Sequence, residues 1–338
     1  MHRLKQRMPS CTVTVACESW QIKRMQDWKT SNEFWSLDGV KHLDGFVEPG
    51  VRWEKLASAY DDGSLLNWHH ALGTQPALIE ADLVLSDNLP QILHHRKDAL
   101  LMGSFLWSDI LGSAYADHPV VKAFVREEEE LLQAHRPHMI CVGDMVMDRV
   151  NENTKAVKMP WFCTKDESSR HHEKNKLHLA LLGGATESLT NILLELAREL
   201  VSDHSITVYL PAPLLKETDG VAGIKLFDFS PQAFRQMNAI VCRPGIGTLT
   251  DCVCYGLPVI ALLEPDNVEM AHNARRVESL GIGVSIDPSK GRERIKKEIE
   301  QFLNENSLEQ ASEKISRLEG NGIDATAEWL IQYFNRLK

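Results

Sequence analysis

The strongest constraint on the fold is a regular alternation, between residues 177 and 286, of short apolar runs with stretches of helical periodicity. Glu187–Val201, for example, places its apolar residues on one face of a helix. This alternation is typical of a parallel sheet with crossover helices, and it predicts a doubly wound α/β domain. The expected strands are Leu177–Leu182, Ile206–Leu210, Ile224–Phe227, Ala239–Cys242, Val259–Leu263 and Gly283–Ile286.

The residues before this region carry a weaker signal of the same kind. Strands are expected at Thr12–Cys17, Leu83–Ser86 and Met139–Val142. A chain of 338 residues is long enough for two domains. We therefore expect an N-terminal domain over 1–150, a polar linker over 151–176, a second domain over 177–320, and an amphipathic helix over 321–338 that docks on a domain.

Composition excludes some classes of protein and favours others. The net charge of −10 argues against a nucleic-acid binder, which normally has a basic face. The seven cysteines include no CxxC pair, which favours reduced thiols and a cytoplasmic location. No apolar run approaches the ~20 residues that a membrane-spanning helix needs, which leaves open only a peripheral membrane association.

A glycine-rich loop between an expected strand and an expected helix carries the clearest chemical signal. The loop reads Arg243-Pro244-Gly245-Ile246-Gly247-Thr248. Glycines let a backbone come close to a ligand, and free N–H groups at a helix start suit a diphosphate. An isolated Gly-x-Gly turn with a threonine cap would be unremarkable on its own, so the residues that follow decide the interpretation.

A second polar loop follows the next expected strand. It reads Glu264-Pro265-Asp266-Asn267 and leads into a helix that contains Glu269 and Asn273. Both loops lie at the C-terminal ends of neighbouring parallel strands, which is where open α/β sheets bind ligands.

The whole segment 239–287 resembles the C-terminal domain of GT-B glycosyltransferases, whose pattern is roughly (H/R)xGxGTxxE…GxP…P…(D/E)QxxNA…E…G. It is most similar to the UDP-N-acetylglucosamine–lipid I transferase and its sugar-nucleotide relatives. The resemblance implies two Rossmann-like, doubly wound domains and a metal-independent hexosyltransferase. It also implies a UDP-sugar as co-substrate, an acceptor that the sequence does not identify, and no cofactor.

The resemblance assigns the diphosphate and ribose contacts to the first loop. Gly245, Gly247 and Thr248 match the diphosphate-binding loop, and Arg243 matches a position near the phosphates. Asp251 matches the ribose-binding acid, although the family usually has the longer glutamate there.

Further contacts are implied on either side of that loop. Glu269 and Asn273 match positions that contact the donor sugar, whereas Met270 replaces the usual glutamine. The pair Gly183-Gly184 matches the turn that donor phosphates approach. Phe229 ends a segment, 227–229, that matches the place where backbone atoms pair with uracil.

The N-terminal domain departs from the family pattern. It has no counterpart of the first strand and its GxGHxxR loop, and Met1-His2-Arg3-Leu4 looks like the helix that follows that loop. The candidates for a catalytic base are then Asp87, just after an expected strand, and His69. A helix N-cap is the plain alternative for Asp87, and a surface or partly buried histidine is the alternative for His69. The sequence predicts no metal site.

Two other functions stay open at this stage. A nucleotide-sugar hydrolase or epimerase on the same scaffold would need no acceptor groove. A non-catalytic protein that binds a nucleotide sugar would fit the missing GxGHxxR loop.

Overall fold

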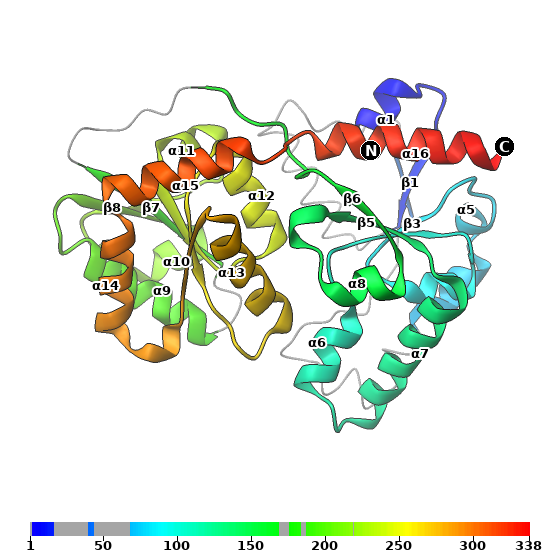
Figure 1. Ribbon diagram of the computed structural model, residues 1–338, viewed down its shortest axis with the longest axis horizontal. Coiled ribbons are helices and arrows are strands. Elements are labelled where there is room, and N and C mark those ends of the chain that lie inside the picture. Colours follow the sequence, from blue (N-terminus) through cyan, green and yellow to red (C-terminus); the bar gives the residue numbers. More distant parts are fainter. Residues whose placement is uncertain (1, 17–39, 44–67, 169–175, 184–186, 219) are drawn as a thin grey trace. The chain divides into compact units, whose positions relative to one another are not determined.

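The computed structural model describes residues 2–16, 40–43, 68–168, 176–183, 187–218 and 220–338 (Figure 1). The chain divides into two compact units. Unit 1 comprises Met1–Met159 and Ile323–Lys338, and unit 2 comprises Pro160–Gly322.

Unit 2 contains a six-stranded sheet in the order β12-β11-β10-β7-β8-β9, and every neighbouring pair is parallel. This is the doubly wound order, in which the chain reverses direction between β7 and β10. The α/β prediction is confirmed for this unit, and two expected strands, β9 and β11, end one residue early. The strands are β7 Leu177–Leu182, β8 Ile206–Leu210, β9 Ile224–Leu226, β10 Ala239–Cys242, β11 Val259–Leu262 and β12 Gly283–Ile286.

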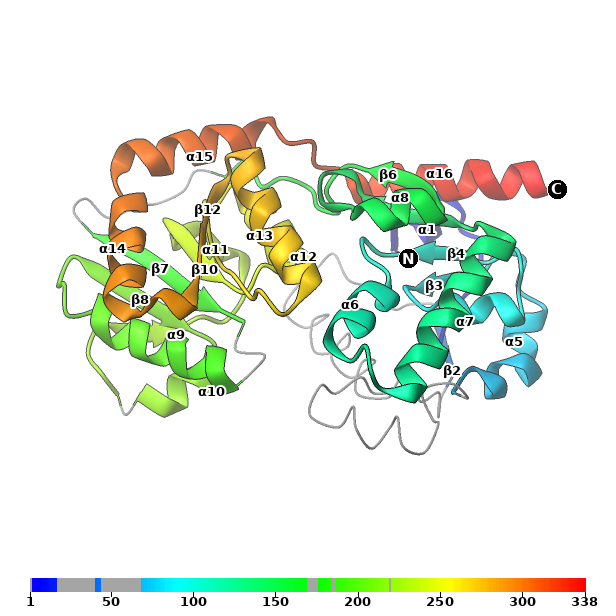
Figure 2. The same cartoon turned by 60° about the horizontal axis from the view of Figure 1, so that its bottom comes forward.

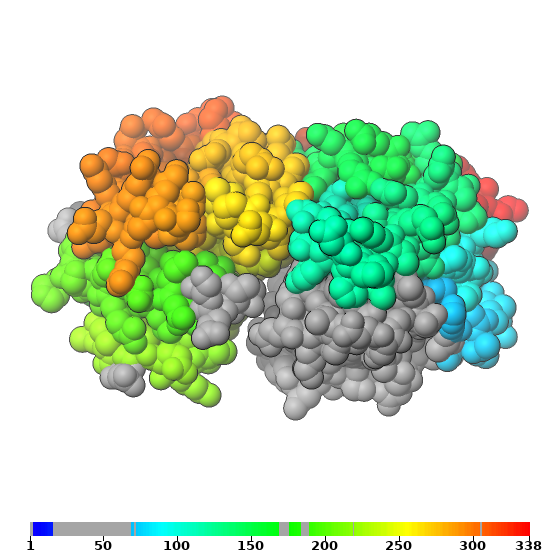
Figure 3. Space-filling model, turned by 90° about the horizontal axis from the view of Figure 1, so that it is seen from below, coloured from blue at the N-terminus to red at the C-terminus, as the bar shows by residue number. Residues whose placement is uncertain are grey.

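Helices cover both faces of this sheet (Figure 2). Apolar residues of α9 and α14 pack with one face of the strands in a single buried cluster. Most charged side chains of α14 are exposed, and Figure 3 shows this helix, in orange, at the surface of unit 2. The helices are α9 Glu187–Leu200, α10 Ala212–Leu215, α11 Pro231–Gln236, α12 Ile246–Tyr255, α13 Val268–Leu280, α14 Arg292–Phe302 and α15 Glu305–Arg317, with 3₁₀ turns η4 Lys216–Thr218 and η5 Pro288–Lys290.

Unit 1 contains a four-stranded parallel sheet, β3-β4-β5-β6, and a separate parallel pair, β1-β2. Three of these strands, β2, β4 and β6, were not expected from the sequence. Strand β6 falls inside the stretch that we expected to be a linker, and it pairs with β5 along its whole length. The strands are β1 Val13–Ala16, β2 Val40–Leu43, β3 Leu85–Asp87, β4 Leu100–Met102, β5 His138–Val142 and β6 Lys155–Met159.

The helices of unit 1 surround a second apolar cluster, which is built on β4, β5 and α7. The C-terminal helix α16 is amphipathic, as expected. Arg7 of α1 pairs with Asp324 and Glu328 of α16. The helices are α1 His2–Arg7, α5 Pro76–Ile79, α6 Trp107–Ala114, α7 Pro119–His135, α8 Asp148–Asn153 and α16 Gly322–Leu337, with η1 Trp68–Thr74, η2 Pro90–His94 and η3 Gly143–Met145.

The two chain segments that join the units are hydrogen-bonded to each other within unit 2. The N–H of Trp161 donates to the carbonyl of Glu319, and the N–H of Gly322 donates to the carbonyl of Trp161. A Cβ at Gly322 would lie 2.2 Å from the Pro160 carbonyl oxygen, so only glycine fits there. Part of the expected linker is therefore ordered structure. Across the residues that the structure describes, no helix is both long and apolar enough to cross a membrane.

Candidate active site

The glycine turn after β7 and the loop after β10 meet at the reversal point of the unit 2 sheet. The two strands are neighbours, and the N–H of Arg243 donates to the Leu182 carbonyl at 3.3 Å. Gly183 has φ +95°, and a Cβ there would lie 2.8 Å from the Cβ of Arg243. Glycine is thus required for both its conformation and its close approach. Its neighbour Gly184 lies outside the described residues.

The start of α12 has the features of an anion-binding helix terminus. Gly245 is the N-cap and offers no side chain to the first-turn N–H groups, whereas Ser230 caps α11 and Asn267 caps α13. A Cβ at Gly245 or Gly247 would meet nothing within 4 Å. Thr248 lies in the first turn and is half-buried. The first turn of α12 therefore presents backbone donors and the positive end of the helix dipole to open space.

The second polar loop holds the first in place. Nε of Arg243 donates to Oε1 of Glu264 at 2.6 Å, and Nδ2 of the buried Asn273 donates to the Pro244 carbonyl at 2.9 Å. Burial raises the pKa of Glu269 to about 7, against the opposing effects of the Arg243 charge and a hydrogen bond from Asn273. The sequence analysis assigned no role to Glu264, although a polar residue two positions after the buried strand β11 was an available signal.

Asp251 lies in the second turn of α12. Burial raises its pKa to about 6. A hydrogen bond with Cys163 is the main cause of the raised pKa of Cys254, and burial is the main cause for Tyr255; the charge of Asp251 adds to both. Among the described residues no cation contributes to the pKa of Asp251. A half-buried carboxylate of this kind suits hydroxyl donors, which satisfy it without adding charge.

The loop after β9 is tied to α12 through aromatic side chains. Phe229 has a left-handed φ of +60° and is 53% exposed, with its ring edge-on to Phe227 at 5.0 Å. Phe234 of α11 stacks on Tyr255 at 4.6 Å. The loop residues expected to contact the uracil thus lie next to the helix expected to hold the diphosphate. The contact with uracil itself stays a prediction.

The two candidate bases lie in unit 1. Asp87 is the last residue of β3 and is exposed at the carboxyl edge of that sheet. His69 lies in η1, is 3% exposed, and its Nδ1 is 3.1 Å from Nε2 of His95. An acceptor reaches this buried ring less readily than it reaches the exposed Asp87. The role of catalytic base stays a prediction for both residues.

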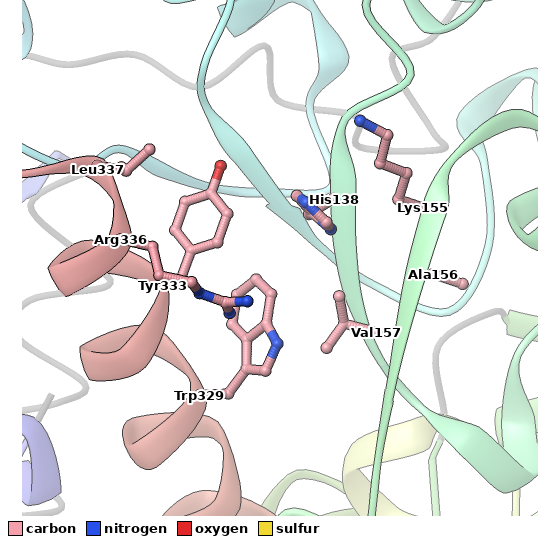
Figure 4. Close-up of a pocket in the computed structure, with 8 residues that line it drawn as sticks. All are labelled: His138, Lys155, Ala156, Val157, Trp329, Tyr333, Arg336 and Leu337. Atoms are coloured by element: carbon pink, nitrogen blue, oxygen red, sulfur yellow. The ribbon is translucent and has the colours of Figure 1, made fainter.

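Unit 1 also contains a pocket of about 540 Å³ between α16 and the amino ends of β5 and β6 (Figure 4). Burial is the main cause of the lowered pKa of His138 in its wall, and the charge of Lys155 also contributes. All of its lining residues belong to unit 1, so this pocket shares no residue with the candidate donor site of unit 2. Its lining residues are His138, Lys155, Ala156, Val157, Trp329, Tyr333, Arg336 and Leu337.

These features define a class of fold: two parallel-sheet α/β units, which match solved structures of GT-B glycosyltransferases. Residues 212–324, which include the α12 loop, match the family model of the glycosyltransferase family 28 C-terminal domain. An uncharacterised glycosyltransferase of Methanopyrus kandleri is 31% identical over 91 residues. That match covers 27% of this chain and 25% of the relative, so the chain matches only about a quarter of the relative's length.

Solved glycosyltransferase structures share the fold over nearly the whole chain. The glycotransferase of kitacinnamycin has a TM-score of 0.63 at 12% identity, with 98% of this chain and 94% of that chain covered. Arabidopsis thaliana UGT89C1 complexed with UDP-L-rhamnose scores 0.59 at 13% identity, covering 98% and 94%. VinC in complex with dTDP scores 0.59 at 15% identity, covering 96% and 92%.

Proposed function

We propose that this protein is a glycosyltransferase that takes a sugar from a UDP-sugar held by unit 2. The observation that carries the proposal is the open, uncapped start of α12 at the reversal point of the sheet. It lies within the segment that matches the family 28 C-terminal domain. UDP-L-rhamnose and dTDP in two structures of the same fold support a nucleoside-diphosphate ligand of this kind.

In this proposal each part of the site has a role in donor binding. The diphosphate lies on the N–H groups of Gly247 and Thr248, with Arg243 nearby. The ribose hydroxyls donate to Asp251, and the sugar lies near Glu269. The base pairs with backbone groups next to Phe229.

The chemical step follows from these roles. A base, Asp87 in our proposal, takes the proton of an acceptor hydroxyl. The acceptor oxygen then forms a bond to the anomeric carbon, the bond from that carbon to the diphosphate oxygen breaks, and UDP leaves. The α12 dipole and Arg243 stabilise the charge that develops on the leaving diphosphate. Transfer is therefore expected without added Mg²⁺.

Calorimetric titration with UDP tests the donor site. Replacing Asp251 with alanine removes a charged hydrogen bond worth roughly 1–3 kcal/mol, so Kd should rise about tenfold or more. Asp203→Ala is the matched control, because Asp203 is exposed and its carboxylate accepts hydrogen bonds only from Ser205 among the described residues. Equal UDP binding by the Asp251→Ala variant and the wild type would refute the ribose assignment. Absence of UDP binding by the wild type would refute the donor site.

Turnover distinguishes transfer from hydrolysis. Incubation with UDP-hexoses and an acceptor panel should yield glycosylated acceptor together with UDP. Free sugar formed equally fast without acceptor would instead indicate a hydrolase, and UDP binding without turnover would indicate a binding protein.

A further inference from the structure

Three side chains from separate elements of unit 1 converge on one point. His69 comes from η1, His94 ends η2, and Glu127 lies in the middle of α7. Their ligand atoms all lie within 4.8 Å of one another. We propose that His69, His94 and Glu127 bind a divalent transition-metal ion of the zinc class.

The distances between the ligand atoms suit such an ion. Oε1 of Glu127 is 2.7 Å from Nε2 of His94 and 3.7 Å from Nε2 of His69. Tetrahedral zinc, with bonds of about 2.0–2.1 Å, separates its ligand atoms by about 3.3 Å. The two observed distances lie on either side of that value, and the ligand atoms of the two histidines lie within 4.8 Å of each other, so the side chains rotate to close the site around an ion.

The orientation of the histidine rings gives a second argument. The rings of His69 and His94 are nearly parallel, at 14°, with centroids 4.8 Å apart. Both rings present Nε2 to the same carboxylate oxygen. Two imidazoles and a carboxylate are a ligand set that zinc prefers.

A neighbouring histidine fixes the orientation of the buried ligand. Nε2 of His95 donates to the His69 carbonyl at 2.9 Å and lies 3.1 Å from Nδ1 of His69. The His95 ring itself packs so closely on Gly73 that a Cβ there would lie 2.7 Å from it. These contacts hold the His69 ring with its Nε2 towards Glu127.

One carboxylate oxygen of Glu127 is available to bind an ion. Its second oxygen, Oε2, is buried and has no hydrogen-bond partner among the described residues. A buried carboxylate oxygen without a partner is costly, and a cation bound at this site would offset that cost. The side chain of His94 is 38% exposed, so an ion can enter from solvent.

Zinc titration of the metal-free full chain tests the site. Wild type should bind one equivalent of ZnCl₂ by calorimetry, and His94→Ala and Glu127→Gln should each weaken that binding about tenfold or more. His135→Ala and Glu130→Gln, on the same helix α7, are the matched controls and should bind as wild type does. Wild-type zinc affinity in both site variants would show that the ion binds elsewhere and would refute the proposal, as would the absence of binding in the wild type.

Thermal unfolding gives an independent readout that does not depend on activity. Zinc holds together η1, η2 and α7, so it should raise Tm by roughly 2–5 °C in wild type and in both controls. The same addition should leave the Tm of His94→Ala unchanged. A rise of equal size in that variant would contradict the site. The candidate donor site shares no residue with the proposed zinc site. UDP titration of each variant therefore distinguishes a failure of the zinc site from a failure of the donor site.

Discussion

At the residue scale, the glycines most informative about a ligand are those at which a Cβ would meet no neighbouring atom, because packing does not explain them. Gly183 must be glycine for its backbone conformation and close approach, so its presence says little about a ligand. Gly245 and Gly247 have neither constraint, since Gly245 has an ordinary φ of −69° and Gly247 lies within α12. Gly245 is the N-cap of α12, a position that glycine favours, so Gly247 is the more informative of the two. A ligand that approaches the backbone would explain glycine at Gly247.

Gly247→Ala tests that reason directly. Alanine favours a helix by up to about 1 kcal/mol over glycine, so the free energy of unfolding should stay constant or rise. UDP binding should nevertheless weaken about tenfold, because the new methyl group occupies space that we assign to the diphosphate. Calorimetry and urea unfolding measure the two effects separately.

The control for this variant is Gly112→Ala in α6. A Cβ at Gly112 makes only an ordinary contact, 3.7 Å from a methyl carbon of Val125. It should stabilise the protein in the same way and leave UDP binding unchanged. UDP binding at wild-type strength by Gly247→Ala would exclude a diphosphate at this turn.

Glu128 of α7 makes stability depend on pH. It is fully buried, and burial raises its pKa to about 7, although the N–H of Ser108 donates to Oε1 at 2.7 Å. The folded state holds this proton more tightly than the unfolded state does, so stability falls as pH rises from about 4.5 to about 7. Above that range the full cost, on the order of 3 kcal/mol, is present.

The variant Glu128→Gln removes the ionisable group and keeps an acceptor for Ser108. The stability of this variant relative to wild type should therefore increase between pH 5 and pH 8. Urea unfolding at both pH values measures the change. A constant difference between the two proteins would mean that Glu128 does not titrate in this range.

At the element scale, the C-terminal helix α16 packs in unit 1, although the rest of that unit comes from residues 1–159. Its Trp329 stacks on Tyr333 at 5.0 Å and meets the ring of His138 at 5.6 Å. The stripe of apolar residues made the helix predictable, but not its docking site. That site depends on β5 and β6. Strand β6 was missed because its two lysines are three residues apart, which breaks the alternation of a half-buried strand, and because it lies inside a polar stretch.

Trp329→Ala should therefore destabilise unit 1. Loss of a half-buried indole and its ring contacts is expected to cost roughly 2 kcal/mol of unfolding free energy. Gln332→Ala, on the exposed side of the same helix, should stay within about 0.5 kcal/mol of wild type. Chemical denaturation followed by tryptophan fluorescence, with circular dichroism as a second probe, measures both, and equal stability of the two variants would show that α16 docks without Trp329.

At the scale of the whole molecule, the sequence was most informative where local pattern and fold agree. In unit 2 the strands β7, β8, β10 and β11 are buried apolar runs, and β9 and β12 are partly exposed. The expected bounds of all six agree with the structure to within a residue. In unit 1 the strand β4 has three residues, too few for a periodic signal, and β3, which was expected, begins two residues later than predicted. The features of the candidate sites also divide into those that the sequence located and those that it did not. Loop positions followed from strand ends, whereas the pairing of Arg243 with Glu264 and the cluster at Glu127 depend on side chains brought together only by tertiary packing.

Because each unit has its own sheet and apolar cluster, two ligands that bind different units should act on different unfolding transitions. UDP at about 100 times its Kd should stabilise unit 2 by about 2.7 kcal/mol, and zinc should stabilise unit 1. Differential scanning calorimetry of the full chain should then show two components, one raised by UDP alone and the other by zinc alone. A single component raised by both ligands would mean that the units unfold together, whereas a component that moves with the wrong ligand would contradict the assignment of that site to its unit.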